Sequence, residues 1–79
     1  MLVVEIADSS LNNDRKTRSA LYAAAGISEY WIVNLVNSQL EVQRDPSGGG
    51  YRCITILTPD EEVTPLNATG SIPVRDFMP

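Results

Sequence analysis

The chain has 79 residues, of which 43% are hydrophobic, and its ten acidic and six basic residues give a net charge of −4. This length excludes more than one domain, and the hydrophobic content excludes a disordered chain. With no histidine and a single cysteine, the sequence also excludes an internal disulfide, a cysteine zinc site and a histidine base.

The first predicted elements are a strand and a helix. Residues 2–7 are apolar on both alternating faces apart from Glu5, which is typical of a strand covered on both sides in a parallel sheet. After a polar break, an alanine-rich segment spanning about residues 13–25 predicts a helix. Asp14 complements the dipole at its start, and Gly26 is placed to end it.

A second apolar segment completes a βαβ unit. Residues 29–35 predict a strand, and a strand–helix–strand crossover of this kind is almost always right-handed. Tyr30 and Trp31 point to opposite faces of this strand. We therefore interpret them as core residues and not as a platform for stacking nucleic-acid bases.

The next segment predicts antiparallel strands. Glu41 and Gln43 alternate with apolar residues, which indicates a strand with one face in water. Residues 46–50 form a glycine-rich loop, and residues 51–57 predict the next strand. Cys53 lies in that strand and is interpreted as a small buried residue.

The C-terminal tail predicts a short edge strand at residues 63–66 and one helical turn at residues 73–78. No internal repeat or linker interrupts the chain, so residues 1–79 are expected to form a single α/β domain, a βαβ unit followed by an antiparallel β-meander. No signal-peptide pattern and no apolar run of roughly 20 residues is present, and we expect a cytoplasmic protein.

Glu5 is the most informative residue for function. A carboxylate within an apolar strand costs several kcal/mol in desolvation (order of magnitude) unless it is paired or binds a cation. One interpretation makes Glu5 a metal ligand at the end of a strand. The other makes it the partner of Arg15 or Arg18, or a residue on an exposed side of the sheet.

The predicted helix carries a polar face. Asp14, Arg18 and Tyr22 recur at intervals of four residues and so share one side. Either they form an ordinary surface ion pair covered by the tyrosine, or Arg18 lies above Glu5 and faces a phosphate or holds the carboxylate. Together with Arg15 and Lys16, Arg18 also forms a small positive spot that could bind nucleic acid, although the acidic net charge disfavours this.

These residues resemble the Uma2 family, a set of endonucleases with the PD-(D/E)xK restriction-endonuclease-like fold. The resemblance covers about residues 2–44 in the same order and spacing, corresponding to the C-terminal portion of that fold. The segments that carry it are Leu2-Val3-Val4-Glu5-Ile6, Asp14-Arg15, Leu21-Tyr22-Ala23-Ala24-Ala25-Gly26-Ile27 and Glu29-Tyr30-Trp31-Ile32-Val33-Asn34.

The resemblance implies Mg²⁺-dependent cleavage of phosphodiester bonds, with two carboxylates from adjacent strands on the metal and a nearby lysine. Glu5 matches the metal-binding glutamate, and Ala7 stands where the usual motif has lysine. In this family the lysine is expected on the following helix, four residues after the aspartate that matches Asp14, and that position is Arg18. The resemblance thus implies Glu5, Asp14 and Arg18 as catalytic residues and Glu5 as the metal ligand.

Two departures from the family pattern bear on activity. The strand with the family's other metal-binding aspartate would precede Leu2, and arginine at position 18 keeps a charge but is a poor proton donor or acceptor. We therefore expect a truncated, inactive relative of a Mg²⁺-dependent endonuclease. The alternative is a non-enzymatic module that covers an exposed sheet edge by homo-oligomerising or by docking onto a separate N-terminal half.

Overall fold

The computed structural model describes residues 2–7, 12–66 and 68–78, and for residues 12–16 it describes the backbone alone. The elements in chain order are β1 (Leu2–Ala7), α1 (Asn12–Ala24), β2 (Glu29–Asn34), β3 (Gln39–Ser47), β4 (Gly50–Leu57), β5 (Glu62–Val63), β6 (Ile72–Pro73) and the 3₁₀ turn η1 (Val74–Phe77). Among these residues no helix has the length and apolar character that crossing a membrane requires.

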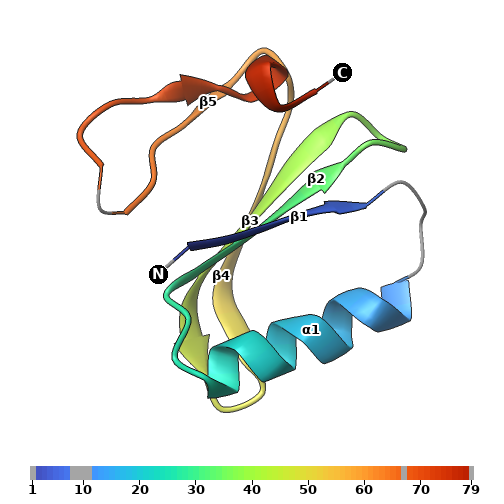
Figure 1. Ribbon diagram of the computed structural model, residues 1–79, viewed down its shortest axis with the longest axis vertical. Helices are drawn as coiled ribbons and strands as arrows, with labels where there is room; N and C mark the ends of the chain where they lie inside the picture. The colour runs from blue at the N-terminus through green and yellow to red at the C-terminus, as the bar shows by residue number, and fades with distance from the viewer. Residues whose placement is uncertain (1, 8–11, 67, 79) are drawn as a thin grey trace.

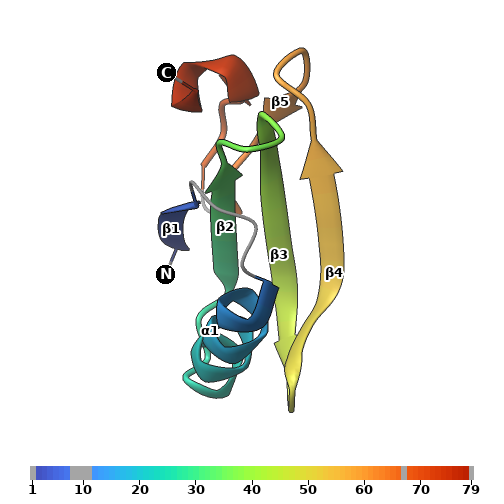
Figure 2. The same cartoon turned by 90° about the vertical axis from the view of Figure 1, so that its right-hand side faces the viewer.

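The four longest strands form one mixed sheet in the order β1-β2-β3-β4 (Figure 1). β1 pairs with β2 in parallel, and the two later pairs are antiparallel. Helix α1 crosses one face of this sheet, and the C-terminal segment from β5 to η1 covers part of the other (Figure 2). The predicted α/β class, with a βαβ unit followed by a meander, is confirmed.

Alternation along β2 divides the apolar core into two layers. Tyr30 and Ile32 point toward α1 and pack with Ala23 and Tyr51. The residues between them point to the other face, where the buried cluster consists of Trp31, Val33, Leu40, Val42, Val63 and Val74. The prediction that Tyr30 and Trp31 lie on opposite faces as core residues is confirmed.

The prediction that β3 has one face in water is wrong. Glu41 and Gln43 are buried, because α1 packs over the side of β3 that carries them. The Ser19 hydroxyl donates to Gln43 Oε1 over 2.8 Å, and the Gln43 amide in turn donates to Glu41 Oε2 over 2.5 Å. This buried polar row therefore fastens the helix to the sheet.

Two predictions about the β3–β4 hairpin are also wrong. The strands run to Ser47 and from Gly50, so most of the expected loop at residues 46–50 is strand. Asp45, near the end of β3, has a left-handed φ of 61°. Cys53 is exposed, because β4 is an edge strand paired on one side only.

The ends of the helix and the tail agree with the sequence-based expectations. Gly26 follows α1 with φ +77°, a left-handed conformation that costs glycine little. Its N–H donates to the carbonyl of Ala23. The expected helical turn in the tail is η1, and the expected edge strand is β5, which is shorter than predicted and begins one residue earlier.

The expectation that β1 is covered on both faces is wrong in one respect. Val3, Glu5 and Ala7 are half-buried toward α1, whereas the alternate residues point to the opposite face and are exposed. Leu2 is 36%, Val4 44% and Ile6 71% exposed. The C-terminal segment packs on Trp31 of the neighbouring strand and leaves this stripe of β1 uncovered.

Candidate functional site

The site is built around Glu5 on the helix-facing side of β1. Its carboxylate accepts hydrogen bonds from three side chains. Arg18 donates from Nη1 to Oε2 over 2.5 Å, and the Tyr22 hydroxyl donates to the same oxygen over 3.1 Å. The Tyr30 hydroxyl donates to Oε1 over 2.6 Å. We call these four residues the Glu5 cluster.

The secondary structure explains why these side chains meet. Arg18 and Tyr22 are four residues apart on α1 and therefore project from the same side of the helix. Glu5 lies opposite Ile32 in the parallel register, and Tyr30, two residues earlier on β2, points to the same face. The rings of Tyr22 and Tyr30 meet edge to face at 4.9 Å between centroids, which fixes both hydroxyls near the carboxylate.

The Glu5 cluster is partly open to water. The Glu5 side chain is 22% exposed and that of Arg18 is 52% exposed. Burial, followed by the hydrogen bond and charge of Glu5, raises the pKa of the Tyr30 phenol well above its ordinary value. The same causes, in the same order, raise the pKa of Tyr22, and the charge of Glu5 raises that of Arg18. All three donors therefore stay protonated at neutral pH.

The described residues do not form a divalent-cation site. They contain no group of three or more acidic, histidine or cysteine side chains placed to hold a metal ion. Both oxygens of Glu5 already accept hydrogen bonds, and Oε2 carries the guanidinium of Arg18. A protein Mg²⁺ site needs oxygen ligands that are free to face the ion, and one oxygen of Glu5 faces the guanidinium of Arg18 instead.

Of the residues predicted to carry chemistry, the structure brings Glu5, Arg18 and Tyr22 together. Of the two interpretations of Glu5, the pairing with Arg18 is the one observed. The side chains of Asp14, Arg15 and Lys16 lie outside the described residues, so their predicted roles stay predictions.

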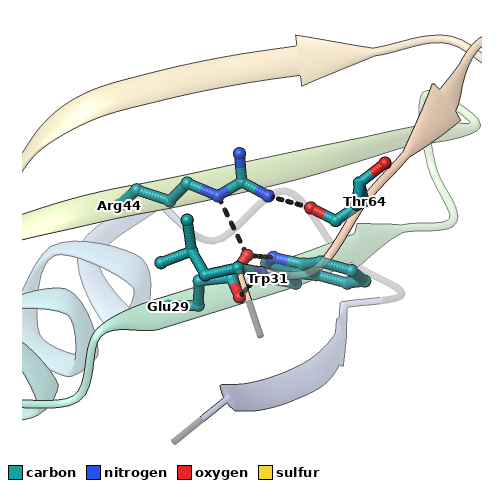
Figure 3. A network of polar contacts seen from close by, with 5 residues as sticks. Glu29, Trp31, Arg44 and Thr64 are labelled. Atoms are coloured by element: carbon teal, nitrogen blue, oxygen red, sulfur yellow. Dashed lines mark hydrogen bonds and ion pairs between the residues drawn. The ribbon is translucent and has the colours of Figure 1, made fainter. Parts of the chain in front are cut away.

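A second group of polar contacts, centred on Glu29, lies on the opposite face of the sheet (Figure 3). It was not predicted from the sequence. Glu29 is 3% exposed and accepts hydrogen bonds from Trp31 Nε1 over 2.8 Å, Arg44 Nε over 2.9 Å and the Leu66 backbone N–H over 2.8 Å. Arg44 also donates to the Thr64 carbonyl over 2.5 Å. These contacts, which we call the Glu29 cluster, fasten the segment after β5 to the sheet.

The pKa of Glu29 reflects two opposing effects. Burial favours the neutral acid and would raise the pKa. The hydrogen bonds from Leu66, Trp31 and Arg44, with the charge of Arg44, outweigh burial and hold the pKa below its ordinary value. Glu29 is therefore a fully paired buried anion, which is a structural role. A hollow of about 280 Å³ lies beside its partner Arg44 and is lined by Val42, Arg44, Thr55, Leu57, Glu62, Val63 and Thr64.

The mixed sheet with helix α1 on one face is consistent with a restriction-endonuclease-like fold. A parallel strand bears a carboxylate toward the following helix, and that helix returns a cation and a tyrosine to it. The model of the Uma2 family, described as "putative restriction endonuclease", matches residues 1–74. The chain belongs to this family. Comparison with curated proteins and with solved structures gave no match.

Proposed function

We propose that this member of an endonuclease family does not cleave phosphodiester bonds by itself and that the Glu5 cluster is an altered nuclease site. The observation that carries the proposal is the contact of 2.5 Å between Arg18 Nη1 and Glu5 Oε2. It places a fixed positive charge on the carboxylate that would otherwise bind Mg²⁺.

The chemistry of the family explains why an arginine paired with Glu5 matters. A bound Mg²⁺ polarises a phosphoryl oxygen and lowers the pKa of its water, which a guanidinium cannot do. Arg18 stays protonated, because Glu5 raises its already high pKa, so it cannot take a proton from water. The two tyrosines are poor bases for the same reason, since both phenols are held in the protonated form.

Phosphate binding is the function that the cluster retains in this proposal. Half of the Arg18 side chain is exposed, so its guanidinium can face a phosphate while it remains on Glu5. The charge of Glu5 and the net charge of −4 both oppose such binding. We therefore expect weak association with nucleic acid that falls steeply as salt is raised.

Nicking of supercoiled plasmid in Mg²⁺ or Mn²⁺ tests the proposal. The expected result is no cleavage above background for the natural chain, and the same background for Glu5→Ala and for the control Asp60→Ala, which changes an exposed acid. Efficient nicking that Glu5→Ala abolishes and Asp60→Ala leaves intact would show that the site is active.

A further inference from the structure

The hollow beside Arg44 lies on the face of the sheet opposite the Glu5 cluster, so a function for it is independent of the proposed function. Residues of β3 and β4 form its sheet side, and β5 with the residue that follows it forms the other side. Its volume of about 280 Å³ corresponds to about nine water molecules at ~30 Å³ each. The hollow therefore has room for a small organic ligand.

Arg44 brings an oriented hydrogen-bond donor to this hollow. Its Nε is held on Glu29 over 2.9 Å and its Nη2 on the Thr64 carbonyl over 2.5 Å. The third nitrogen, Nη1, has no acceptor among the residues that the structure describes, and Figure 3 shows it pointing away from both of these partners. The side chain is 32% exposed. A ligand that accepts from Nη1 would therefore not have to immobilise the guanidinium.

Three aliphatic side chains line the hollow together with this donor. Val42 and Val63 belong to the buried cluster on this face, and Leu57 packs against that cluster. Thr55, which pairs with Val42 across β3 and β4, lies between them and the free edge of β4. A ligand that uses all of these groups has an acceptor at one end and a short hydrocarbon body at the other.

We propose that the hollow binds a small aliphatic carboxylate, with one oxygen on Arg44 Nη1 and the hydrocarbon body against Val42, Leu57 and Val63. A carboxylate supplies the acceptor that Nη1 lacks, and a hydrogen bond between charged groups is stronger than a neutral one. Inorganic phosphate could accept the same bond but has no apolar part. A neutral amide of the same shape keeps the apolar contacts and loses the charge.

Two carboxylates limit the affinity for an anion. Glu29 already pairs with Arg44 from the buried side. Glu62 also lines the hollow, and its Oε1 accepts the Ser71 hydroxyl over 2.7 Å, which holds the charge near the start of β6. Both charges oppose a bound carboxylate, so we expect a dissociation constant on the order of 1 mM. Removal of the Glu62 charge should strengthen binding.

Titration of the complete chain with isocaproate, followed by the amide NMR signals of an isotope-labelled sample, tests the proposal. Saturable shifts are expected at Leu57, Val63 and Thr64. Isocaproamide and inorganic phosphate should bind at least about tenfold more weakly. No saturable shift up to about 50 mM isocaproate, or equally strong binding of the amide or of phosphate, would overturn the proposal.

A charge added inside the hollow should abolish most of the binding. Thr55→Glu places a carboxylate opposite Val42 and should weaken isocaproate binding at least about tenfold. Ile54→Glu adds the same charge at the next residue, which pairs with Gln43 and points to the face that α1 covers in part. This matched control should change binding less than about twofold. Equal weakening by the two variants would contradict the proposed position of the ligand.

A charge removed from the hollow should have the opposite effect. Glu62→Gln keeps the side-chain shape at an exposed position and should strengthen isocaproate binding about threefold. Asp76→Asn, at an exposed acid on η1 that does not line the hollow, is the matched control. Because Glu62 is exposed, this comparison also holds if Thr55→Glu disturbs β4. No strengthening by Glu62→Gln, or the same strengthening by Asp76→Asn, would count against a carboxylate in this hollow.

Discussion

The two faces of the sheet each hold a glutamate paired with an arginine, and the two clusters differ in their access to water. Glu29 is 3% exposed, and its partners include a backbone N–H and an indole. Glu5 is 22% exposed, and its partners are the ends of three side chains, one of them half in solvent.

A glutamate–arginine pair therefore has a different role on each face of the sheet. The Glu29 cluster ties a distant segment to the sheet and depends on complete burial and complete hydrogen bonding. The Glu5 cluster depends less on burial, because water reaches its carboxylate and half of the Arg18 side chain. A functional site is accordingly expected at Glu5, and a structural one at Glu29.

The largest expected effect that follows from this contrast is on stability. Glu29→Ala leaves the Trp31, Arg44 and Leu66 donors without their acceptor and should lower the free energy of unfolding by about 3 kcal/mol. Urea unfolding followed by Trp31 fluorescence measures this loss. The control Glu62→Ala, at an exposed acid on β5, should change stability by less than about 0.5 kcal/mol. Equal losses of unfolding free energy for Glu29→Ala and Glu62→Ala would show that the Glu29 cluster has no special structural role.

The pH dependence of stability should show the same distinction. The folded-state pKa of Glu29 lies below its ordinary value, so unfolding takes up a proton in acid. The contribution of Glu29 is complete above the ordinary pKa of a glutamate and is lost as the pH falls through the lower folded value. Glu29→Gln should therefore flatten the acid limb of a plot of unfolding free energy against pH. An unchanged slope below about pH 4.5 would contradict this assignment.

At the Glu5 cluster the expected change in stability is smaller. Tyr30→Phe removes one hydrogen bond to Glu5 and keeps the packing of the ring, so it should cost about 1 kcal/mol. Tyr51→Phe, which removes a hydrogen bond to the Ile27 carbonyl in the same apolar layer, is the matched control and should cost a similar amount. A loss for Tyr30→Phe as large as that for Glu29→Ala would make the Glu5 cluster structural as well.

The smallest expected effect is on a phenol titration. Burial and then Glu5 raise the pKa of Tyr30, so Glu5→Gln should lower that pKa, while the contribution of burial remains. The pKa of Tyr51 is raised chiefly by burial and should change little. Ultraviolet titration of the natural chain and of Glu5→Gln, each compared with its Tyr30→Phe form, measures the change. The same Tyr30 pKa in the natural chain and in Glu5→Gln would mean that the hydrogen bond from Tyr30 to Glu5 does not form in solution.

Local spacing predicted the Glu5 cluster better than any other feature. The interval of four residues between Arg18 and Tyr22 places both on one side of α1, and the apolar strand makes Glu5 need a partner. Tyr30 could not be added in the same way, because its meeting with Glu5 depends on the parallel register of β1 and β2.

The remaining errors arise from long-range packing. Alternation along β3 shows which side of the strand is polar and does not show that α1 covers Glu41 and Gln43. The Glu29 cluster joins residues up to 37 positions apart, through the hairpin register that sets Glu29 opposite Arg44 and through the path of the tail. Periodicity within one segment contains neither of these relations.

Binding of Mn²⁺ at Glu5 is the most direct test of the central claim, that Arg18 occupies the place of the metal. In a Mn²⁺ titration followed by paramagnetic broadening of amide NMR signals, we expect no selective broadening of Glu5 and its neighbours in the natural chain at about 1 mM ion. We expect stronger broadening in Arg18→Ala, which removes the guanidinium from Oε2 and leaves only the Tyr22 hydroxyl on that oxygen. Selective broadening around Glu5 in the natural chain at tens of micromolar Mn²⁺, unchanged by Arg18→Ala, would contradict it.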